Sequence, residues 1–358
     1  MRALALCVAA AIVVVAGASA AAPPPPPAAK IAACNSGRIG ILAPFTGRYG
    51  AVGRDQLNGA SAALDAFNAA NGTHFTLRPG DTRLAPKRAA SVGAAFASDR
   101  KLLATIGPAG SQEATVLGKT FTRAGLPAVL SSATSVVLSG GAYPTLSRVV
   151  GSDAVQGRSD ALFMIEKLHA RKVLIVDDSE PYSALLATTA ARVLKSNGVK
   201  VVRRSVNQTV TDFTSIVNGI ASDTSVVFLP WHAVPNAALF AHQLRDQGVA
   251  AKLLGSDGLD TARFAVAGAY VSSFARAIRG SLFGPSAYVA AQVIATAYEA
   301  ASADGTASRA ELLQSIRAVE LPRTILGVPV TFDRHGEVPG ARYYVSQIQS
   351  DGKHKLVW

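Results

Sequence analysis

The chain has 358 residues, of which 49% are hydrophobic and 6% aromatic, so it can bury a sizeable core filled mainly by Ala, Val and Leu. The formal net charge is +12, but the basic residues are scattered, in pairs such as Lys87-Arg88 and Arg203-Arg204, and form no stripe of the kind that binds nucleic acid. Of the two cysteines, Cys7 lies in a segment expected to be removed, so Cys34 has no partner and no disulfide holds the fold.

The N-terminus has the pattern of a secretion signal. One positive charge at Arg2 precedes an apolar core, and Ala18-Ser19-Ala20 forms a small-x-small cleavage site, so residues 1–20 are expected to be a signal peptide. The apolar core is short for a membrane span and a proline run at 23–27 soon follows, although an uncleaved membrane anchor stays open as an alternative.

Residues 21–36 are expected to form a tether rich in Pro and Ala, without side chains that could build a core. Within this tether, Ile31-Ala32-Ala33-Cys34 looks like a lipidation site. It lies beyond the proline run and Lys30, detached from the apolar core of the signal, so a lipid anchor at Cys34 is the less favoured alternative.

The mature chain opens with a strand, a glycine-rich loop and an amphipathic helix. The apolar run from Ile39 to Leu42 suits a strand that is covered on both faces. The pattern Gly47-x-x-Gly50-x-x-Gly53 then interrupts it. One helix face follows at three- and four-residue spacing, formed by Leu57, Ala60, Leu64 and Phe67. An exported chain that opens in this way favours a protein that binds small solutes.

The alternation of strand and helix then repeats along the chain. We expect strands at 74–77, 102–106 and 126–130 and helices at 85–99 and 111–123. After a link near 143–151 the pattern restarts, with helices at 153–169, 182–197, 212–221 and 236–247 and strands at 173–176, 199–202, 226–229 and 252–254. The last part predicts helices at 285–302 and 309–319 and a hairpin-like end made of 328–332, a turn at 333–336, and 343–349.

Alternating buried strands and helices predict parallel sheets with helices on both faces. Each run is too short for a large barrel, and the chain pauses near 143–152 before the rhythm restarts. The pattern therefore favours an α/β fold of two doubly wound parallel-sheet lobes over the alternative, a single TIM-like barrel.

Nine segments in a fixed order carry a family likeness: IGILAPFTGRYGAVGRDQLNGASAALDAFNAANG, ATIGPAGSQEAT, GLPAVLSSATS, YPTLSRVVGSDAVQG, VLIVDDSEPY, TDFTSIV, LLGSDGLD, GPSAYVAAQVIATAYEA and VTFDRHGEVPGARYYVSQI. They span nearly the whole mature chain. Together they resemble the type I periplasmic solute-binding proteins of the branched-chain amino acid (Leu/Ile/Val) class, which serve ABC importers. The likeness is specific for the fold and class, and less specific for the ligand.

The resemblance implies two lobes joined by a three-strand hinge, with residues 37–150 and 281–326 in the first lobe and 151–280 and 327–358 in the second. The lobes would close over a small amino acid-like or carboxylate ligand. The resemblance also implies a monomer in the periplasm, which delivers its ligand to an inner-membrane ABC permease.

An enzyme is not expected, because the chain contains no HExxH, GxSxG or Walker motif. The six histidines show no metal-ligand spacing, and the glycine pattern at 47–53 is not the one that binds dinucleotides, so neither a metal nor a cofactor is expected. A ligand-sensing protein that feeds a separate receptor or regulator stays open as the alternative function, since the fold serves that role too.

Ligands of open α/β sheets bind beyond the carboxyl ends of the strands, where free N–H groups of helix N-termini suit a carboxylate. By similarity, Ser111 occupies the position whose hydroxyl and backbone hold the ligand carboxylate, a role that can coexist with a plain N-cap. The loop with Ala133 and Thr134 would offer a carbonyl to the ligand ammonium and a hydroxyl and N–H to the carboxylate, with a simple turn as the alternative.

Two tyrosines and one aspartate match further cleft positions of the family. Tyr49 lies in the first glycine-rich loop, and Tyr182 begins a helix, although Ser183 follows it where the family usually has Gly. Asp257 matches the acidic residue that pairs with a ligand α-ammonium, whereas an ordinary Asp-Gly turn is the alternative. Half-buried packing is the alternative for both tyrosines.

One segment departs from the family pattern. A Gly-Gly-Tyr-Tyr-type segment often follows the fourth strand of the second lobe, but this chain has Pro230-Trp231-His232-Ala233-Val234. We therefore add Trp231, as a stacking face, and His232, as an optional positive charge, to the expected ligand-binding residues. A larger, aromatic or anionic ligand becomes an alternative to an amino acid. Phe283 is one further candidate near the cleft.

Overall fold

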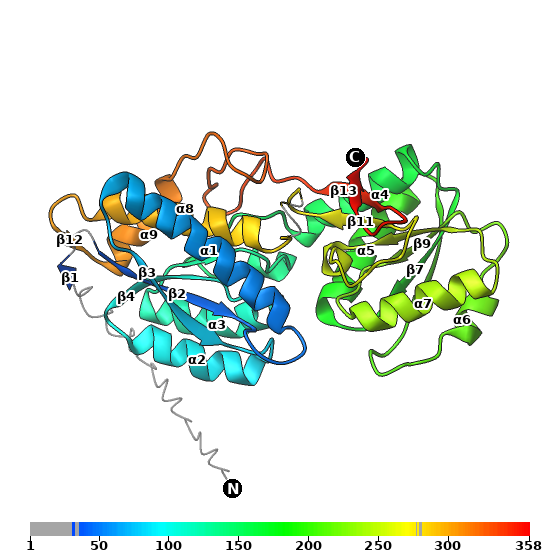
Figure 1. Ribbon diagram of the computed structural model, residues 1–358, viewed down its shortest axis with the longest axis horizontal. Coiled ribbons are helices and arrows are strands. Elements are labelled where there is room, and N and C mark those ends of the chain that lie inside the picture. Colours follow the sequence, from blue (N-terminus) through cyan, green and yellow to red (C-terminus); the bar gives the residue numbers. More distant parts are fainter. Residues whose placement is uncertain (1–30, 33–35, 277, 279–280) are drawn as a thin grey trace, which may run out of the picture.

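The computed structural model describes residues 31–32, 36–276, 278 and 281–358, which form two lobes side by side along the longest axis of the molecule (Figure 1). The expected signal peptide at 1–20 and Cys34 lie outside the described residues. Part of the expected tether is structured, because β1 (Ile31–Ala32) pairs antiparallel with β12 (Thr306–Ala307).

The first lobe is built on a sheet of five parallel strands in the order β3-β2-β4-β5-β6. The strands are β2 (Arg38–Ala43), β3 (Thr76–Asp81), β4 (Leu102–Ile106), β5 (Ala128–Leu130) and β6 (Leu146–Arg148). Strand β4 is buried at every residue, as its largely apolar sequence predicts for a strand covered on both faces.

Alternate residues of these strands face two different helix layers. Ile39 and Ile41 pack in one cluster with α1 (Gly50–Asn71), α8 (Gly284–Ala301) and α9 (Arg309–Ala318). Leu42 packs on the opposite face with α2 (Pro86–Ser98) and α3 (Ser111–Ala124). Val136–Leu138 adds one 3₁₀ turn after β5.

Helices α1 and α8 lie side by side although they are far apart in the chain (Figure 1). Their close approach depends on Gly59, because a Cβ atom at this position would lie 2.1 Å from the carbonyl oxygen of Gly284. At the start of α8, Asp55 of α1 accepts hydrogen bonds from the backbone N–H groups of Leu282, Phe283 and Gly284. The glycine and the carboxylate thus fix the two helices as one unit.

The second lobe has a seven-stranded sheet in the order β14-β13-β11-β10-β9-β7-β8. The strands are β7 (Lys172–Asp177), β8 (Lys200–Ser205), β9 (Val226–Leu229), β10 (Lys252–Gly255), β11 (Tyr270–Ser273), β13 (Tyr344–Ile348) and β14 (His354–Leu356). All pairings are parallel except the two that involve β13, which is antiparallel to β11 and to β14.

Helices cover both faces of this sheet as well. Helices α4 (Asp153–Glu166) and α5 (Pro181–Ser196) pack on one face. Helices α6 (Thr214–Asn218) and α7 (Val234–Asp246) pack on the other, and Asp257–Leu259 forms a 3₁₀ turn after β10. Two open, mainly parallel sheets confirm the expected α/β fold of two doubly wound lobes and exclude a single barrel.

The chain passes between the lobes three times: from β6 to α4, from β11 to α8, and ahead of β13. The predicted hairpin at the end is wrong in its first half. Residues 328–332 form only the isolated bridge of Val330 with Leu321, and Val328, Val330 and Val338 are buried in the core of the first lobe. We therefore propose the expected lobe ranges with one amendment, in which residues 327–338 join the first lobe.

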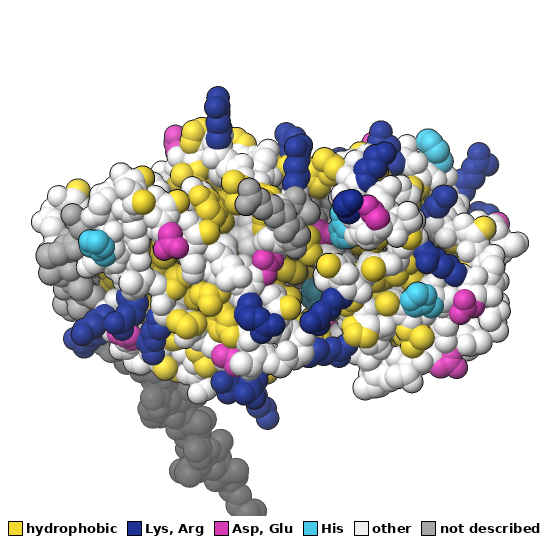
Figure 2. All heavy atoms as spheres, in the orientation of Figure 1, with side chains coloured by type: hydrophobic (Ala, Val, Ile, Leu, Met, Phe, Trp, Pro, Cys, Tyr) yellow, Lys and Arg dark blue, Asp and Glu magenta, His cyan; other side chains and the backbone are white. Residues whose placement is uncertain are grey.

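The distribution of charge on the surface and the character of the helices agree with what the sequence indicated. Figure 2 shows Lys and Arg side chains spread over both lobes on this face, without a continuous basic stripe. Among the helices of the described residues, none combines the length and the apolar character that crossing a membrane requires.

Candidate ligand-binding site

A cavity of about 400 Å³ lies between the two lobes. Its lining comes from loops that follow the carboxyl ends of strands in both sheets, which is where open α/β sheets bind ligands. Many of the lining side chains are apolar: Pro44, Ala51, Val52, Leu84, Ala109, Val234, Pro235 and Phe283. The cavity therefore suits a small ligand with an apolar body.

At the first-lobe end, helix α3 points its N-terminus at the cavity. Ser111 and Gln112 line the cavity, and no hydrogen bond within the described residues occupies their backbone N–H groups. These N–H groups and the positive end of the helix dipole suit a carboxylate. Gly110 is the N-cap, so the alternative of Ser111 as an N-cap is wrong.

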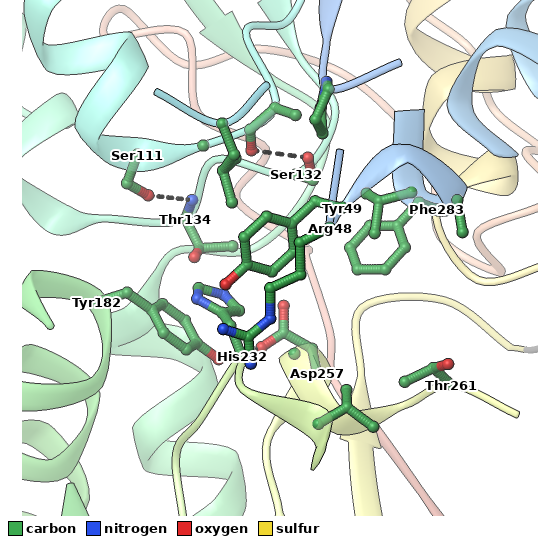
Figure 3. A pocket seen from close by; sticks show the side chains of 18 of the residues that line it. Arg48, Tyr49, Ser111, Ser132, Thr134, Tyr182, His232, Asp257, Thr261 and Phe283 are labelled. Atoms are coloured by element: carbon green, nitrogen blue, oxygen red, sulfur yellow. Dashed lines mark hydrogen bonds between the residues drawn. The ribbon is translucent and has the colours of Figure 1, made fainter. Parts of the chain in front are cut away.

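The hydroxyl of Ser111 instead positions the neighbouring loop (Figure 3). Its Oγ accepts hydrogen bonds from the backbone N–H groups of Thr134, at 3.2 Å, and Ser135, at 3.1 Å. The N–H of Thr134 is therefore already used, whereas its side chain lines the cavity. Ser111 and Thr134 thus lie together at this end of the cavity, as expected.

Ala133 does not line the cavity. Its side chain is buried in the first-lobe core, and its carbonyl oxygen accepts a hydrogen bond at 3.2 Å from Nη1 of Arg148. The expected ammonium contact at Ala133 is therefore corrected, because a buried guanidinium already occupies this carbonyl. Arg148 also donates to the carbonyl of Ser135 and pairs with Glu337.

Ser132, which the sequence did not single out, lines the cavity in a fixed orientation. Its hydroxyl donates to the carbonyl of Ala109 at 2.9 Å and accepts from Nε2 of Gln56 at 2.7 Å. Gln56 is a buried polar residue of α1. Helix α1 therefore helps to hold this loop, as α3 does through Ser111.

At the second-lobe end, three side chains form a connected group. Tyr182 at the start of α5 donates its hydroxyl hydrogen to Oδ1 of Asp257, which also accepts from Nε2 of Gln156 at 2.8 Å. The imidazole of His232 stacks on Tyr182 with ring centroids 4.0 Å apart and an interplanar angle of 20°. Tyr182, His232 and Asp257 all line the cavity, as expected (Figure 3).

Burial dominates the electrostatics of this group. It raises the pKa of the Asp257 carboxyl, an effect opposed by the hydrogen bond from Tyr182 and by nearby His232. Burial also lowers the pKa of His232, against the effect of the nearby acids Asp257, Asp178 and Glu180, which favours the neutral imidazole. The optional positive charge expected at His232 is therefore disfavoured, and this end of the cavity is polar without a fixed cation from the ring.

Helix α4, whose Gln156 donates to Asp257, carries two further buried acids, Asp153 and Asp160. Burial raises the pKa of Asp153 to about 7, the hydroxyl of Thr134 and the charge of Arg148 oppose the shift, and Asp257 adds to it. Burial likewise raises the pKa of Asp160 well above its usual value. The side chain between them on the same helix face, Gln156, connects this layer to Asp257.

Trp231 does not reach the cavity, which corrects the expectation of a stacking face. Its side chain is 1% exposed and packs against Phe213 and Phe240 in the second-lobe core. Its indole Nε1 donates to the carbonyl of Val176 at 2.6 Å. In the segment that departs from the family pattern, His232 and Val234 line the cavity, whereas Trp231 belongs to the core.

Tyr49 and Phe283 line the first-lobe wall of the cavity, as expected. Burial raises the pKa of Tyr49, and the negative charges of Asp178 and Glu180 in the second lobe raise it further, against the effect of Arg48. Tyr49 thus reaches across to the opposite lobe. Phe283 is positioned by the hydrogen bond from its backbone N–H to Asp55.

Several lining residues escaped the sequence reading, notably Arg48, Leu84, Gln112, Thr261 and Arg263. Four of them lie in loops that follow strands of the two sheets, and Gln112 lies in the first turn of α3, so their position beyond a strand end was the signal that could have identified them. Across the described part of the chain, no group of three or more His, Cys, Asp or Glu side chains is arranged to hold a metal ion.

Comparison with known proteins defines the class. A model of the family described as periplasmic binding protein matches residues 36–272, about two thirds of the chain. The amino acid binding protein of Pseudomonas aeruginosa is 25% identical over 345 residues, which cover 88% of this chain and 91% of that protein. The chain therefore belongs to the periplasmic binding protein family.

Solved structures agree with this assignment. The leucine binding protein LivK of Thermotoga maritima has a TM-score of 0.80 and 22% identity, with 90% of this chain and 98% of that chain covered. The branched-chain amino acid transporter substrate binding protein LivJ of Streptococcus pneumoniae, solved with isoleucine, has a TM-score of 0.80 and 22% identity, with 90% and 99% covered. The predicted resemblance to the Leu/Ile/Val class is confirmed. The family is one of binding proteins, not enzymes.

Proposed function

We propose that the chain is the substrate-binding component of an ABC importer, a periplasmic monomer exported through a cleaved signal peptide. It captures a small amino acid-like or carboxylate ligand between its lobes by hinge closure and delivers it to an inner-membrane permease. The observation that carries the proposal is one cavity whose walls come from both lobes, so that a bound ligand stabilises the closed arrangement.

The two ends of the cavity bind different groups of the ligand. The ligand carboxylate accepts hydrogen bonds from the backbone N–H groups of Ser111 and Gln112, with the Thr134 hydroxyl beside them. An ammonium or another polar group of the ligand meets the second oxygen of Asp257 and the His232 ring. The apolar body packs against side chains such as Leu84 and Phe283. The names of the relatives, which include amino acid and branched-chain amino acid binding proteins, support this choice of ligand class.

A thermal-shift screen tests the proposal. The protein is unfolded, dialysed to remove any bound ligand and refolded, and is then titrated with Leu, Ile, Val, aromatic acids and small amides. A ligand that binds only the folded state raises the melting temperature, by an amount set by its concentration relative to Kd. Failure of every carboxylate to shift the melting temperature would overturn the proposal.

Variants then place the ligand in the cavity. Asp257→Asn should weaken binding of an α-amino acid by about tenfold, because it removes a charge-assisted contact with the ammonium. Ser111→Ala should also weaken binding, because the loop that carries Thr134 loses the hydroxyl that holds it in place. Asp246→Asn, at the exposed end of α7, is the matched control. Import and sensing are distinguished by comparing uptake of the labelled ligand in cells with and without the protein. Loss of the protein lowers uptake if it is an importer component, and leaves uptake unchanged if it is a sensor.

A further inference from the structure

Two arginines line the cavity from opposite lobes. Arg48 lies in the loop between β2 and α1 of the first lobe, and Arg263 lies in the loop after β10 of the second. Figure 3 shows the Arg48 side chain extending from its loop toward the side of the cavity that carries Tyr182, His232 and Asp257. Both arginines are exposed, which places them at the mouth of the cavity.

Neither guanidinium is neutralised. Within the described residues, no ion pair and no side-chain hydrogen bond involves Arg48 or Arg263, and the contact that Arg48 makes is with the ring of Tyr49, at 5.8 Å. Elsewhere the chain pairs arginines that lie near carboxylates, as with Arg203 and Asp177 at 2.7 Å. The cavity therefore has two guanidinium groups that are free to meet a ligand.

The carboxylate that lines the same cavity, that of Asp257, does not neutralise the charges of the two arginines. Asp257 is 5% exposed, and one of its oxygens already accepts hydrogen bonds from Tyr182 and Gln156. The arginines, in contrast, belong to the solvent-facing rim. Because both arginines line one cavity from opposite lobes, an anion bound between them would offset the repulsion of their like charges and favour the closed arrangement.

The first-lobe end of the cavity is a separate place for an anion. There the unpaired backbone N–H groups of Ser111 and Gln112 meet the positive end of helix α3. A ligand with one carboxylate can satisfy the α3 end or the arginines, but not both. A ligand with an acidic group at each end of an apolar body satisfies both, and it fits the apolar lining between them.

We propose that Arg48 and Arg263 form a second anion-binding subsite, and that the ligand is a dianion with an apolar body, such as a dicarboxylate. The proposal rests on the proposed function and names its substrate class. Arginine suits this task because its planar guanidinium binds carboxylates with paired hydrogen bonds and stays charged at all physiological pH values. The arginines then determine specificity, since they distinguish a dianion from a monoanion of the same shape.

The test compares each dicarboxylate with its own monomethyl ester, which keeps the body and length and removes one charge. Calorimetric titration of the refolded protein uses succinate, adipate, suberate and isophthalate with their monoesters. For the member that fits, we expect the dianion to bind about tenfold or more tightly than its ester. Arg48→Gln and Arg263→Gln should each weaken the dianion by about tenfold and leave the ester within about twofold.

Arg158→Gln is the matched control, because Arg158 is an exposed arginine of α4 that does not line the cavity. In the double variant, the losses should be non-additive for the dianion, since both arginines contact one carboxylate. Equal binding of diacid and monoester, or unchanged affinity in both single variants, would overturn the proposal alone. Failure of every diacid, monoester and amino acid would overturn the proposed function with it.

Discussion

The guanidinium of Arg148 lies 2.6 Å from Oε2 of Glu337, which joins the end of the edge strand β6 to the segment that leads into the third crossing between the lobes. Arg148 is buried, and it also donates to the carbonyls of Ala133 and Ser135. One side chain therefore holds the loop that carries Thr134 in place and connects it to a crossing segment.

Arg148→Met should destabilise the protein by about 3–5 kcal/mol, because it leaves Glu337 and two carbonyls without their donor. Glu337→Gln should cost less, since the amide oxygen still accepts a hydrogen bond. Urea unfolding measures both, with the exposed Arg158→Met as control. Ligand affinity should fall in Arg148→Met as the loop at 132–135 loosens. A variant that unfolds like the parent would show that the ion pair does not support this loop.

Trp231→Phe should affect stability and leave ligand binding unchanged. The substitution removes the hydrogen bond to Val176 and part of the packing against Phe213 and Phe240, at a cost of about 1–3 kcal/mol. Calorimetry with the ligand found in the screen should give an affinity within about twofold of the parent. His232→Gln is the informative partner, because the neighbouring residue lines the cavity. A larger loss of affinity in Trp231→Phe than in His232→Gln would restore Trp231 to the site.

Asp153 makes stability depend on pH with a definite sign. Burial raises its pKa from 3.8 to about 7 in the folded protein. The folded state therefore holds the proton more tightly than the unfolded chain, and this contribution to stability is lost as the pH rises from about 4 to about 7. Asp153→Asn, which cannot ionise, should exceed the parent in stability above neutral pH by up to about 4 kcal/mol, and by much less at acidic pH.

Urea unfolding of Asp153→Asn and the parent near pH 5 and near pH 8 measures this difference. Asp246→Asn, an exposed aspartate of α7, controls for the change of residue type. Because other buried acids, such as Asp160, titrate in both proteins, only the difference between variant and parent reports on Asp153. The same difference at both pH values would contradict the prediction.

Gly59→Ala should destabilise the first lobe although alanine favours helices. The added methyl group would lie 2.1 Å from the carbonyl oxygen of Gly284, so α1 and α8 would have to separate. We expect a net loss of about 1–3 kcal/mol, with the clash outweighing the gain in helix propensity. Gly340→Ala, where the new methyl group meets open space, is the control and should be near neutral. Thermal unfolding of the two variants decides the comparison.

The strands were predictable where burial is continuous. Leu102–Ile106 and Val226–Leu229 were expected at their observed bounds because the first is apolar at every residue but Thr105 and the second is apolar throughout. Strands β6, β11 and β14 escaped prediction, because short runs such as Leu146–Arg148 and Tyr270–Ser273 mix polar residues with apolar ones. Their strand character comes from pairing with neighbours that are distant in sequence.

The sequence predicted which segments form the site, but it predicted less well which of their side chains line the cavity. Tyr49, Ser111, Thr134, Tyr182, His232 and Asp257 line the cavity because strand ends of a parallel sheet converge. Trp231 and His232 are adjacent, yet one side chain enters the core and the other the cavity, and no local pattern distinguishes them. The carbonyl of Ala133 is occupied by a buried arginine at the end of β6, which lies further along the chain, so the loop sequence alone could not show that this carbonyl is unavailable.

The side-by-side packing of α1 and α8 also sets the order in which the chain can fold. Ile39 and Leu64, near the start of the mature chain, are covered by Ile294 and its neighbours, which are synthesised much later. A growing chain that ends before Gly284 exposes this apolar surface and has no complete core in its first lobe. The late synthesis of α8 therefore delays completion of the first-lobe core until most of the chain has been made.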